Sequence, residues 1–600
     1  MLRYAGFLLA VVFAVPSFAQ QLPPAPKLLI PSEIGTAKNL PPAPKYLTGR
    51  DPVPANASAN SGHAEHSPAA PRERRSAKPK PVAQKAVQHN ALASADAAPA
   101  AIGPAAIAVG DLSVRVTFPD GVHVFDARNG EDLGDYHGPG FVQRNIEVRD
   151  PKIPLTIFFR PDRSRKRAEV VFEWGNPFHP NPHPLGPYTA EILNDGRPIA
   201  RLSVPEQYWL SRWRWQSAPR PVIRTPADLI AHRLVPPYAR IGTAPLPPPA
   251  KPYKIMGLSS VDPYMPATGE RPDIGLLPEA SAAYLATGDA TALRSVFAWA
   301  EASGTIPWHL RDPETNAPLS YDKYPKATTY YDQMRGGAPH LYLSYPPGLV
   351  IDGAHRPELD YLPFLLTGDP YYLEEMEFAE TYVLGDYPGH NCIIRHDQVR
   401  EYAWTLRSLF YLIAALPNNV PKWLLPKSYW KEKLSRNFRW IMENYVNNKS
   451  IKTAYFHSGV DVGRMPFWQE DYFSAVLGLG VWMGFEDWRP VLAWKIASTI
   501  DRADGKSGWP RSRPTFYWPK LVRPQDGRMV SSWAELAALN GVVPTPDGML
   551  DRSADLNYVS FARGALAMAV NAGISQARAP FQWLDGQLRG RRIAWRWSLR

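Results

Sequence analysis

The sequence predicts two folded domains in tandem, an N-terminal antiparallel β-sandwich followed by an (α/α) toroid of helical hairpins. Short runs of β-branched and aromatic residues, separated by turn formers, occupy residues 106–245. From residue 255 the hydrophobic pattern changes to the helical period, and it continues to residue 588. The chain, with 600 residues, is also too long for one ordinary domain.

The chain begins with a segment that has the features of an export signal. Arg3 precedes an apolar run, and the small residues of Ser17-Phe18-Ala19 resemble a signal peptidase site. We therefore expect residues 1–19 to be a signal peptide and the mature protein to be periplasmic or extracellular. Because this run is short for a bilayer span and no later segment is apolar for long enough, we expect no integral membrane segment after cleavage.

Residues 20–105 are rich in proline, alanine, lysine and small polar residues, and they contain the near repeats QLPPAPKLL and NLPPAPKYL. This composition predicts a disordered, semi-extended linker. The alternative is that the two LPPAPK motifs dock onto the folded body.

The formal net charge is +11, and much of the excess lies in two short segments. Residues 72–80 belong to the linker, and residues 589–600 are expected to form a basic C-terminal tail. Such segments could bind anionic polymers without specificity, or they could be solvated and bind nothing. Export and the lack of a nucleic-acid-binding motif argue against a nucleic-acid partner.

The β domain is expected to contain short strands joined by turns such as PDG, RNGED and NDG. The candidate strands are LSVRVTF, GVHVFDA, FVQRNIEV, IPLTIFF, AEVVFEW, YTAEIL and RPIARLSV. Near the end of the domain, an extended backbone in WLSRWRW (209–215) would place the side chains of its three tryptophans on one face and those of its two arginines on the other.

Two segments of the same design begin the helical domain. Residues 276–303 and 359–384 are each predicted to form a helix, a tight turn and a second helix. The glycine of a Thr-Gly-Asp joint would end the first helix, and the aspartate would cap the second. These residues are Gly288, Asp289, Gly368 and Asp369. We expect Pro357 to open the first turn of its helix. Further helices are predicted at 397–416, 427–446, 468–484, 488–502, 531–540, 555–572 and 576–588.

The helix predicted at 397–416 has two unlike faces. At about 100° per residue, one stripe brings five side chains within about 80° of one another. They are His396, Arg400, Trp404, Arg407 and Tyr411. In a toroid, an inner helix would turn its second face, or its N-terminal end, to a central cleft. The alternative is a surface helix, which usually carries Lys, Glu and Gln on its wet side, so we favour the cleft.

Two stretches of the helical domain resemble a known group of enzymes. AHRPELDYLPFLLTGDPYYLEEM (354–376) and RHDQVREYAWTLRSLFYLIAAL (395–416) are similar to the catalytic domain of rhamnogalacturonan exolyase-type proteins. They cover about one tenth of the chain. The predicted architecture also resembles the six-hairpin glycosidase-like toroids of polysaccharide-active proteins. The resemblance implies an enzyme that cleaves a polysaccharide.

The residue types in this domain suit β-elimination on an acidic polysaccharide. A uronate lyase needs a base for the proton α to the carboxylate, an acid for the leaving oxygen, and a cation that neutralises the carboxylate. The residues expected to act in catalysis are His396, Arg400, Tyr411, His355 and Tyr361. The residues expected to bind substrate are Arg407, Trp404, Arg356, Trp468, Gln469, Glu470, Asp471 and Tyr472. For His355 and Arg356 the alternative is a local capping or pairing role.

Two other functions remain open. A glycoside hydrolase would need two carboxylates that flank the glycosidic bond. The candidates are Asp352, Glu358, Asp360, Asp397, Glu470 and Asp471. Acidic residues in a first helical turn are also ordinary partners of the helix dipole. A non-catalytic envelope protein that binds a glycan would share the aromatic cleft but would need no acid–base pair.

No residue pattern points to a metal or a cofactor, and we expect neither. The one cysteine, Cys392, excludes an internal disulfide and a Cys-based metal site. His179 and His183 would suit a metal only on a helix, and the prolines and glycine around them forbid one. The chain has no P-loop, no Rossmann glycine pattern and no GxSxG.

Overall fold

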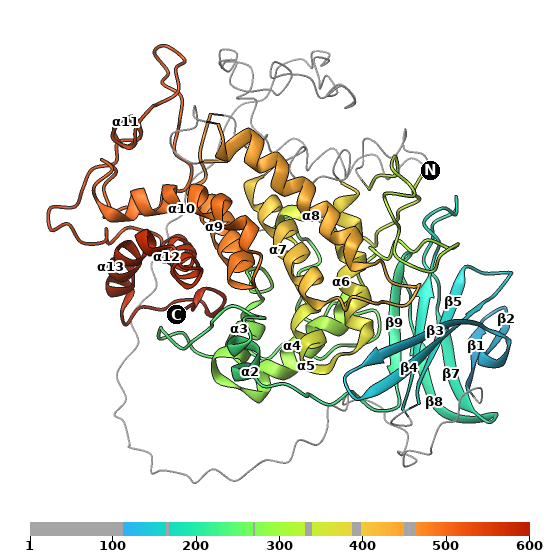
Figure 1. Ribbon diagram of the computed structural model, residues 1–600. Coiled ribbons are helices and arrows are strands. Elements are labelled where there is room, and N and C mark those ends of the chain that lie inside the picture. Colours follow the sequence, from blue (N-terminus) through green and yellow to red (C-terminus); the bar gives the residue numbers. More distant parts are fainter. Residues whose placement is uncertain are drawn as a thin grey trace, which may run out of the picture. The chain divides into compact units, whose positions relative to one another are not determined.

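The computed structural model describes residues 112–163, 167–267, 270–329, 339–386, 398–448, 455–456 and 463–600. The predicted signal peptide and linker lie outside the described residues, as do Cys392, His396 and Asp397. An antiparallel β region at residues 112–216 is followed by a helical region (Figure 1). The prediction of a β part followed by an α part is therefore confirmed.

The β region consists of two antiparallel sheets, ordered β2-β1-β7-β8 and β3-β4-β5-β6-β9. The strands are β1 (Leu112–Phe118), β2 (Gly121–Asp126), β3 (Glu131–Gly138), β4 (Phe141–Arg149), β5 (Leu155–Asp162), β6 (Arg167–Trp174), β7 (Tyr188–Asn194), β8 (Arg197–Val204) and β9 (Ser211–Gln216). Every run predicted as a strand forms one. The sequence analysis missed β3, because its sequence EDLGDYHG is polar and contains two glycines.

Strand β9 presents different side chains on its two faces, as predicted for WLSRWRW. Trp213 stacks on Phe172 with ring centroids 4.0 Å apart, and its Nε1 donates to the hydroxyl of Tyr188 in the other sheet at 2.8 Å. On the opposite face, the Arg212 and Arg214 side chains reach the helical region. The face of β9 that carries Trp213 therefore joins the two sheets, and the face that carries the two arginines binds α6.

The helices form hairpins in which α3 packs on α4, α5 on α6, α7 on α8, α9 on α10 and α12 on α13. Their bounds, with those of α2 and α11, are α2 (Pro226–Ala231), α3 (Glu279–Thr287), α4 (Ala290–Ser303), α5 (Tyr361–Thr367), α6 (Pro370–Leu384), α7 (Val399–Ala415), α8 (Lys427–Ile441), α9 (Phe467–Trp482), α10 (Arg489–Asp504), α11 (Trp533–Leu539), α12 (Leu556–Asn571) and α13 (Arg578–Leu588). The first helices of successive hairpins also touch, since α5 packs on α7, α7 on α9 and α9 on α12.

The Thr-Gly-Asp joints form as predicted. Gly288 and Gly368 end α3 and α5 in the left-handed conformation, with φ of 71° and 68°. Asp289 accepts from the Ala292 amide, and Asp369 accepts from the Tyr371 amide, so each aspartate caps the next helix.

The predicted helix start at Pro357 is wrong, because α5 begins at Tyr361. Pro363 explains the difference. A helix that began at Pro357 would place Pro363 in its interior, where proline cannot donate a hydrogen bond and its ring clashes with the preceding turn. With the start at Tyr361, Pro363 lies in the first turn, where no intrahelical donor is needed.

An ion network joins the β region to α6, and we call it the α6 network. The arginines of β5 and β9 supply its positive charges, and Glu374 and Glu375 of α6 supply carboxylates. Arg212 Nε lies 2.5 Å from Glu375 Oε1, and Arg160 Nη2 lies 2.6 Å from Glu374 Oε2. The remaining members are Arg214, Arg311, Glu169, Glu173, Glu301, His309 and Asp369. These pairs hold α6 against the β region.

The C-terminal segment does not project as the expected basic tail. Ile593, Trp595, Trp597 and Leu599 are buried, and the Trp597 ring stacks on Tyr472 of α9 with centroids 5.1 Å apart. Since four apolar side chains alternate with the basic residues, this segment gains more by packing than by solvation. Only its first residues, from 589 to 592, and its last, Arg600, are exposed.

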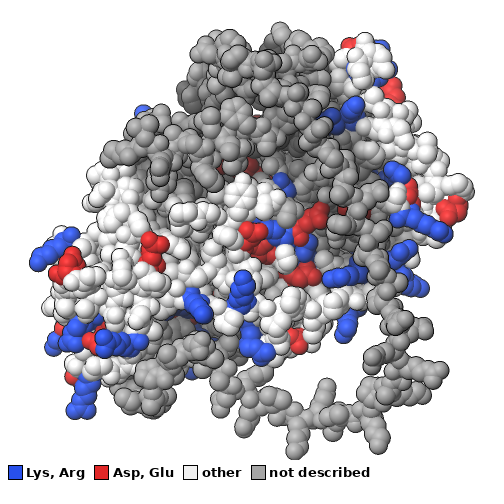
Figure 2. Space-filling view, turned by 180° about the vertical axis from the view of Figure 1, so that it is seen from behind, with Lys and Arg blue, Asp and Glu red and all other residues white. Residues whose placement is uncertain are grey.

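The surface charge is mixed rather than uniformly basic. On the face drawn in Figure 2, Lys and Arg side chains are interspersed with Asp and Glu. In the described part of the chain, every helix is too short or too polar to cross a lipid bilayer.

Candidate functional site

Most of the predicted stripe on α7 faces the interior. Trp404, Arg407 and Tyr411 have no exposed surface. Arg407 donates to the carbonyls of Gly275 and Arg356 at 2.6 and 3.1 Å. The Tyr411 hydroxyl donates to the Leu276 carbonyl at 3.0 Å. These side chains tie α7 to the segment before α3, so the prediction that they line a cleft is wrong.

Two predicted residues before and within α5 are also interior. Tyr361 stacks on Tyr411 with centroids 4.0 Å apart, and its hydroxyl donates to the Leu234 carbonyl at 2.6 Å. Arg356 pairs with Glu380 at 2.6 Å. Both side chains are at most 1% exposed, so they are placed to stabilise the fold rather than to contact a substrate.

The acidic pair at the start of α9 joins it to α10. Glu470 lies 2.5 Å from Lys495 Nζ, and Asp471 lies 2.5 Å from Arg502 Nη2. All four side chains are fully buried. Only Glu470 lies in the first turn of α9, as the dipole alternative requires, and because both carboxylates are paired with buried cations, neither is placed to act on a glycan.

The N-terminal ends of α7 and α9 bring another set of predicted residues together. The Arg400 guanidinium lies over the Trp468 ring, 4.9 Å from its centroid. Gln469 Oε1 accepts from the Arg400 amide at 3.2 Å, which fixes the two helix ends to each other. Tyr472, one turn further along α9, packs edge-on against Trp468 at 5.6 Å. The N-terminal ends of α7 and α9 are thus joined to each other, and Arg400 and Trp468 keep 8% and 6% of their surface exposed.

A histidine–carboxylate pair lies beside Arg400. His355 Nδ1 and Asp352 Oδ2 are 2.5 Å apart. Asp352 also accepts from the Ala354 amide, and Arg271 donates to the His355 carbonyl at 2.9 Å, so the short turn that carries the pair is fixed at both ends. No described residue hydrogen-bonds to His355 Nε2.

The pKa values of this pair depend on Arg400. Burial lowers the pKa of His355; Asp352 opposes this effect and the charge of Arg400 adds to it. Burial alone would raise the pKa of Asp352, but the hydrogen bond and charge of His355, with Arg400, bring it below its usual range. At neutral pH the arrangement therefore favours a neutral imidazole that donates from Nδ1 to an ionised carboxylate.

Two tyrosines from later segments complete the site. The Tyr517 ring is nearly parallel to Trp468 at 6.1 Å, and the Tyr558 ring of α12 lies 5.8 Å from Trp468. Burial and a hydrogen bond to Glu270 raise the pKa of Tyr558, so its hydroxyl stays protonated at neutral pH. We define the Arg400 cluster as Asp352, His355, Arg400, Trp468, Gln469, Tyr517 and Tyr558.

Sequence reasoning missed Tyr517, Tyr558 and Glu270. They come from three segments that are distant along the chain from α7 and from one another. No periodicity or motif links them, because their proximity depends on how α12 packs on α9. The one available signal was the run of three aromatic residues in FYWPK (516–520), whose exposure the sequence could not give.

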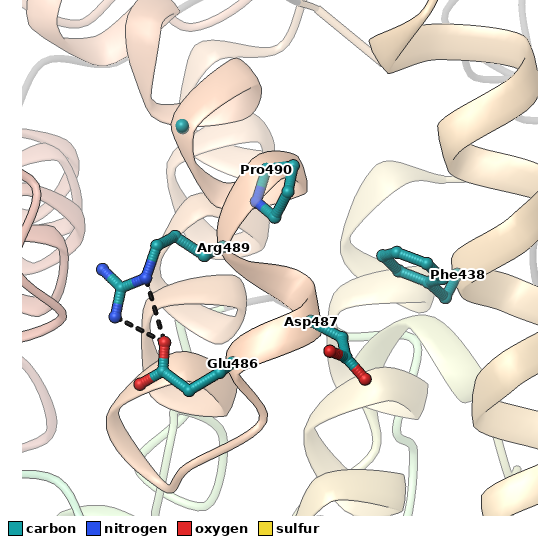
Figure 3. Close-up of a pocket in the computed structure, with 6 residues that line it drawn as sticks. Phe438, Glu486, Asp487, Arg489 and Pro490 are labelled. Atoms are coloured by element: carbon teal, nitrogen blue, oxygen red, sulfur yellow. Dashed lines mark hydrogen bonds and ion pairs between the residues drawn. The ribbon is translucent and has the colours of Figure 1, made fainter.

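A hollow lies elsewhere on the molecule (Figure 3). Its volume is about 520 Å³, and it is lined by Phe438, Glu486, Asp487, Arg489, Pro490 and Ala493. It is near the C-terminal end of α9, about 21 Å along that helix from Trp468 at 1.5 Å per residue. The Arg489–Glu486 pair at 2.6 Å is half exposed, and the lining offers no buried acid–base pair.

The described residues contain no group of three or more His, Cys, Asp or Glu side chains that could hold a metal ion.

None of the known protein-family models, curated proteins or solved structures matches this chain. The case for a function therefore depends on the geometry of the Arg400 cluster.

Proposed function

We propose that this chain is an exported enzyme that cleaves an acidic polysaccharide by β-elimination at the Arg400 cluster. The observation that carries the proposal is the His355–Asp352 pair, 2.5 Å apart, next to a guanidinium that lies over an aromatic ring. A base, a carboxylate-binding cation and a sugar-stacking ring are the groups that this reaction needs.

The chemistry assigns one role to each group. His355 Nε2 accepts the proton α to the uronate carboxylate while Asp352 holds Nδ1–H, and Arg400 pairs with that carboxylate as negative charge develops. The electrons of the broken C–H bond form a C4–C5 double bond, and the C4–O bond breaks. Tyr558 is the candidate acid that protonates the leaving oxygen, because its ring packs on Trp468 and its hydroxyl carries a proton at neutral pH.

The surroundings of the candidate carboxylates favour elimination over hydrolysis. Glu470 and Asp471 are bound to cations of α10. Glu358 accepts from Ser408 at 2.8 Å, Asp360 accepts from Ser303 at 3.0 Å, and both are buried. Within the described residues, Asp352 is the candidate that remains near the cluster, and hydrolysis requires a pair.

The order of helix contacts supports the toroid as part of this proposal. Each hairpin's first helix packs on the next from α5 to α12. The short C-terminal helix η9 (Trp595–Trp597) touches both α3 and α12, which are the first helix of the first hairpin and of the last. In a closed ring, the N-terminal ends of inner helices such as α7 and α9 would surround one site.

The test is an incubation of the purified protein with pectic, alginate and glycosaminoglycan polymers. Elimination produces an unsaturated uronate, which absorbs in the ultraviolet, together with new reducing ends. Reducing ends without that absorbance would identify hydrolysis and overturn the elimination mechanism. Binding without either product would identify a glycan-binding protein, and no binding would contradict the proposal altogether.

A further inference from the structure

The exposed ring of Tyr517 is unusual for an aromatic side chain in this molecule. It lies between α10 and α11 and is 57% exposed, whereas Trp468 beneath it is 6% exposed. Burial of a tyrosine ring is favourable by the hydrophobic effect, so an exposed ring on an aromatic base offers a contact surface to a ligand.

Three rings of similar orientation form this surface. The Tyr517 centroid is 6.1 Å from Trp468 and 5.7 Å from Tyr558, and the interplanar angles are 6° and 39°. Ring faces of this kind pack against the C–H faces of pyranoses as they pack against other apolar surfaces. The neighbouring Asn557 amide and Glu270 carboxylate, 3.4 Å apart, can exchange hydrogen bonds with sugar hydroxyl groups.

The charge beside the platform selects the kind of sugar. The Arg400 guanidinium lies 4.9 Å from the Trp468 centroid, whereas the nearby Arg596 is already paired with Glu279 at 3.3 Å, so Arg400 is the cation that can pair with a sugar carboxylate. A sugar that carries a carboxylate would therefore be favoured over a neutral one.

A sugar bound at Arg400 and His355 would leave Tyr517 to the next sugar of the chain, since the Tyr517 centroid lies 6.1 Å from the ring that Arg400 covers. We infer that Tyr517 forms a stacking subsite for a second residue of an acidic glycan, adjacent to the residue that is cleaved. This inference rests on the proposed function and adds that productive binding requires an oligomer rather than a single uronate.

The variant Tyr517→Ala tests the subsite, and its exposure means that the fold tolerates the change. We expect its affinity for polygalacturonate or alginate oligomers to fall about tenfold, as expected for one lost stacking contact. The KM should rise by the same factor, with kcat within about twofold, because the subsite holds sugar that does not react. Tyr517→Phe keeps the ring and should behave as wild type.

Trp518→Ala is the matched control. Trp518 is next in the chain and 39% exposed, but its ring lies against Arg464 at 4.4 Å rather than on the platform. Equal affinities for Tyr517→Ala and wild type, or equal losses in the Tyr517 and Trp518 variants, would overturn the subsite.

Affinity, measured by calorimetry, separates this inference from the proposed function. If wild-type protein binds the oligomers through Tyr517 but forms no product, the enzymatic proposal fails while the subsite stands. If the Tyr517→Ala variant forms product with the KM of wild type, the subsite fails while the enzymatic proposal stands. If it binds none of the oligomers, both are contradicted.

Discussion

Arginine is buried in two regions of this molecule, with different kinds of partners. In the α6 network, Arg160, Arg212 and Arg311 surround the Glu374 carboxylate at 2.6, 3.0 and 3.2 Å. In the Arg400 cluster, the guanidinium lies over an aromatic ring beside a histidine–aspartate pair. Only the second region also holds a largely exposed aromatic ring, at Tyr517, which is 57% exposed.

The difference separates two uses of buried charge. Charges in the α6 network are fixed by opposite charges from another element, so a ligand could bind there only by displacing them. The Arg400 cluster presents ring faces and an imidazole nitrogen with no described hydrogen-bond partner. Changes in the first region should therefore alter stability, and changes in the second should alter turnover.

Apart from the loss of Arg400, the largest effect is expected for His355→Asn. The asparagine amide can still donate to Asp352, but it removes the Nε2 base. We expect kcat to fall by about 10³-fold, within the range for loss of a general base. Thermal unfolding should remain near that of wild type. Turnover above a tenth of the wild-type rate would remove His355 from the mechanism.

Glu374→Gln should have the next largest effect, which is on the free energy of unfolding rather than on turnover. It leaves three guanidinium groups around a neutral amide, and breaking a buried ion pair in this way costs about 3–5 kcal/mol. Denaturant unfolding measures the loss. Glu486→Gln, which breaks a half-exposed pair with Arg489, is the control and should change stability by less than about 1 kcal/mol. Equal losses in the two variants would show that the α6 network is not what fixes α6.

The pH dependence of stability should follow from the same carboxylate. Burial alone would raise the pKa of Glu374, but Arg160, Arg212 and Arg311 lower it to about 2, from 4.5 in an unperturbed chain. A lowered pKa stabilises the fold above pH 4.5, and this contribution is lost as the pH falls toward 2. Between pH 7 and pH 3, wild type should lose about 2 kcal/mol more unfolding free energy than Glu374→Gln. Parallel pH profiles would contradict this assignment.

Asp352→Asn should produce the smallest effect, in the pH profile of turnover. Asp352 raises the pKa of His355, so its removal lowers that pKa further. We expect the acidic limb of kcat/KM to move to lower pH and the maximum rate to fall about tenfold, as orientation of the imidazole is lost. An unchanged acidic limb of kcat/KM would mean that the titration of His355 does not control turnover.

Local structure was predictable because its signals are local. Proline, glycine and aspartate fixed the joints at Gly288 and Gly368, and helical periodicity placed α7 within two residues. The wrong predictions concern contacts between residues that are distant along the chain. Trp404, Arg407 and Tyr411 form a polar-looking stripe, yet the segment before α3 supplies carbonyl acceptors for two of them. No spacing within α7 encodes those acceptors.

The site itself was only partly predictable for the same reason. His355, Arg400, Trp468 and Gln469 were singled out by residue type near helix starts, and the fold brings them together. Glu470 and Asp471 have the same residue-level signal, but α10 places Lys495 and Arg502 against them. The sequence shows which residues can carry chemistry, and tertiary packing decides which of them are neutralised.

The most direct test compares two arginines on the same helix, Arg400 and Arg407, in one assay with the glycan that wild type cleaves. Arg400→Ala should abolish formation of unsaturated product while thermal unfolding stays near that of wild type. Arg407→Ala should lower the unfolding temperature, because two buried carbonyls lose their donor. A protein that still cleaves the glycan without Arg400 would contradict the assignment of the site.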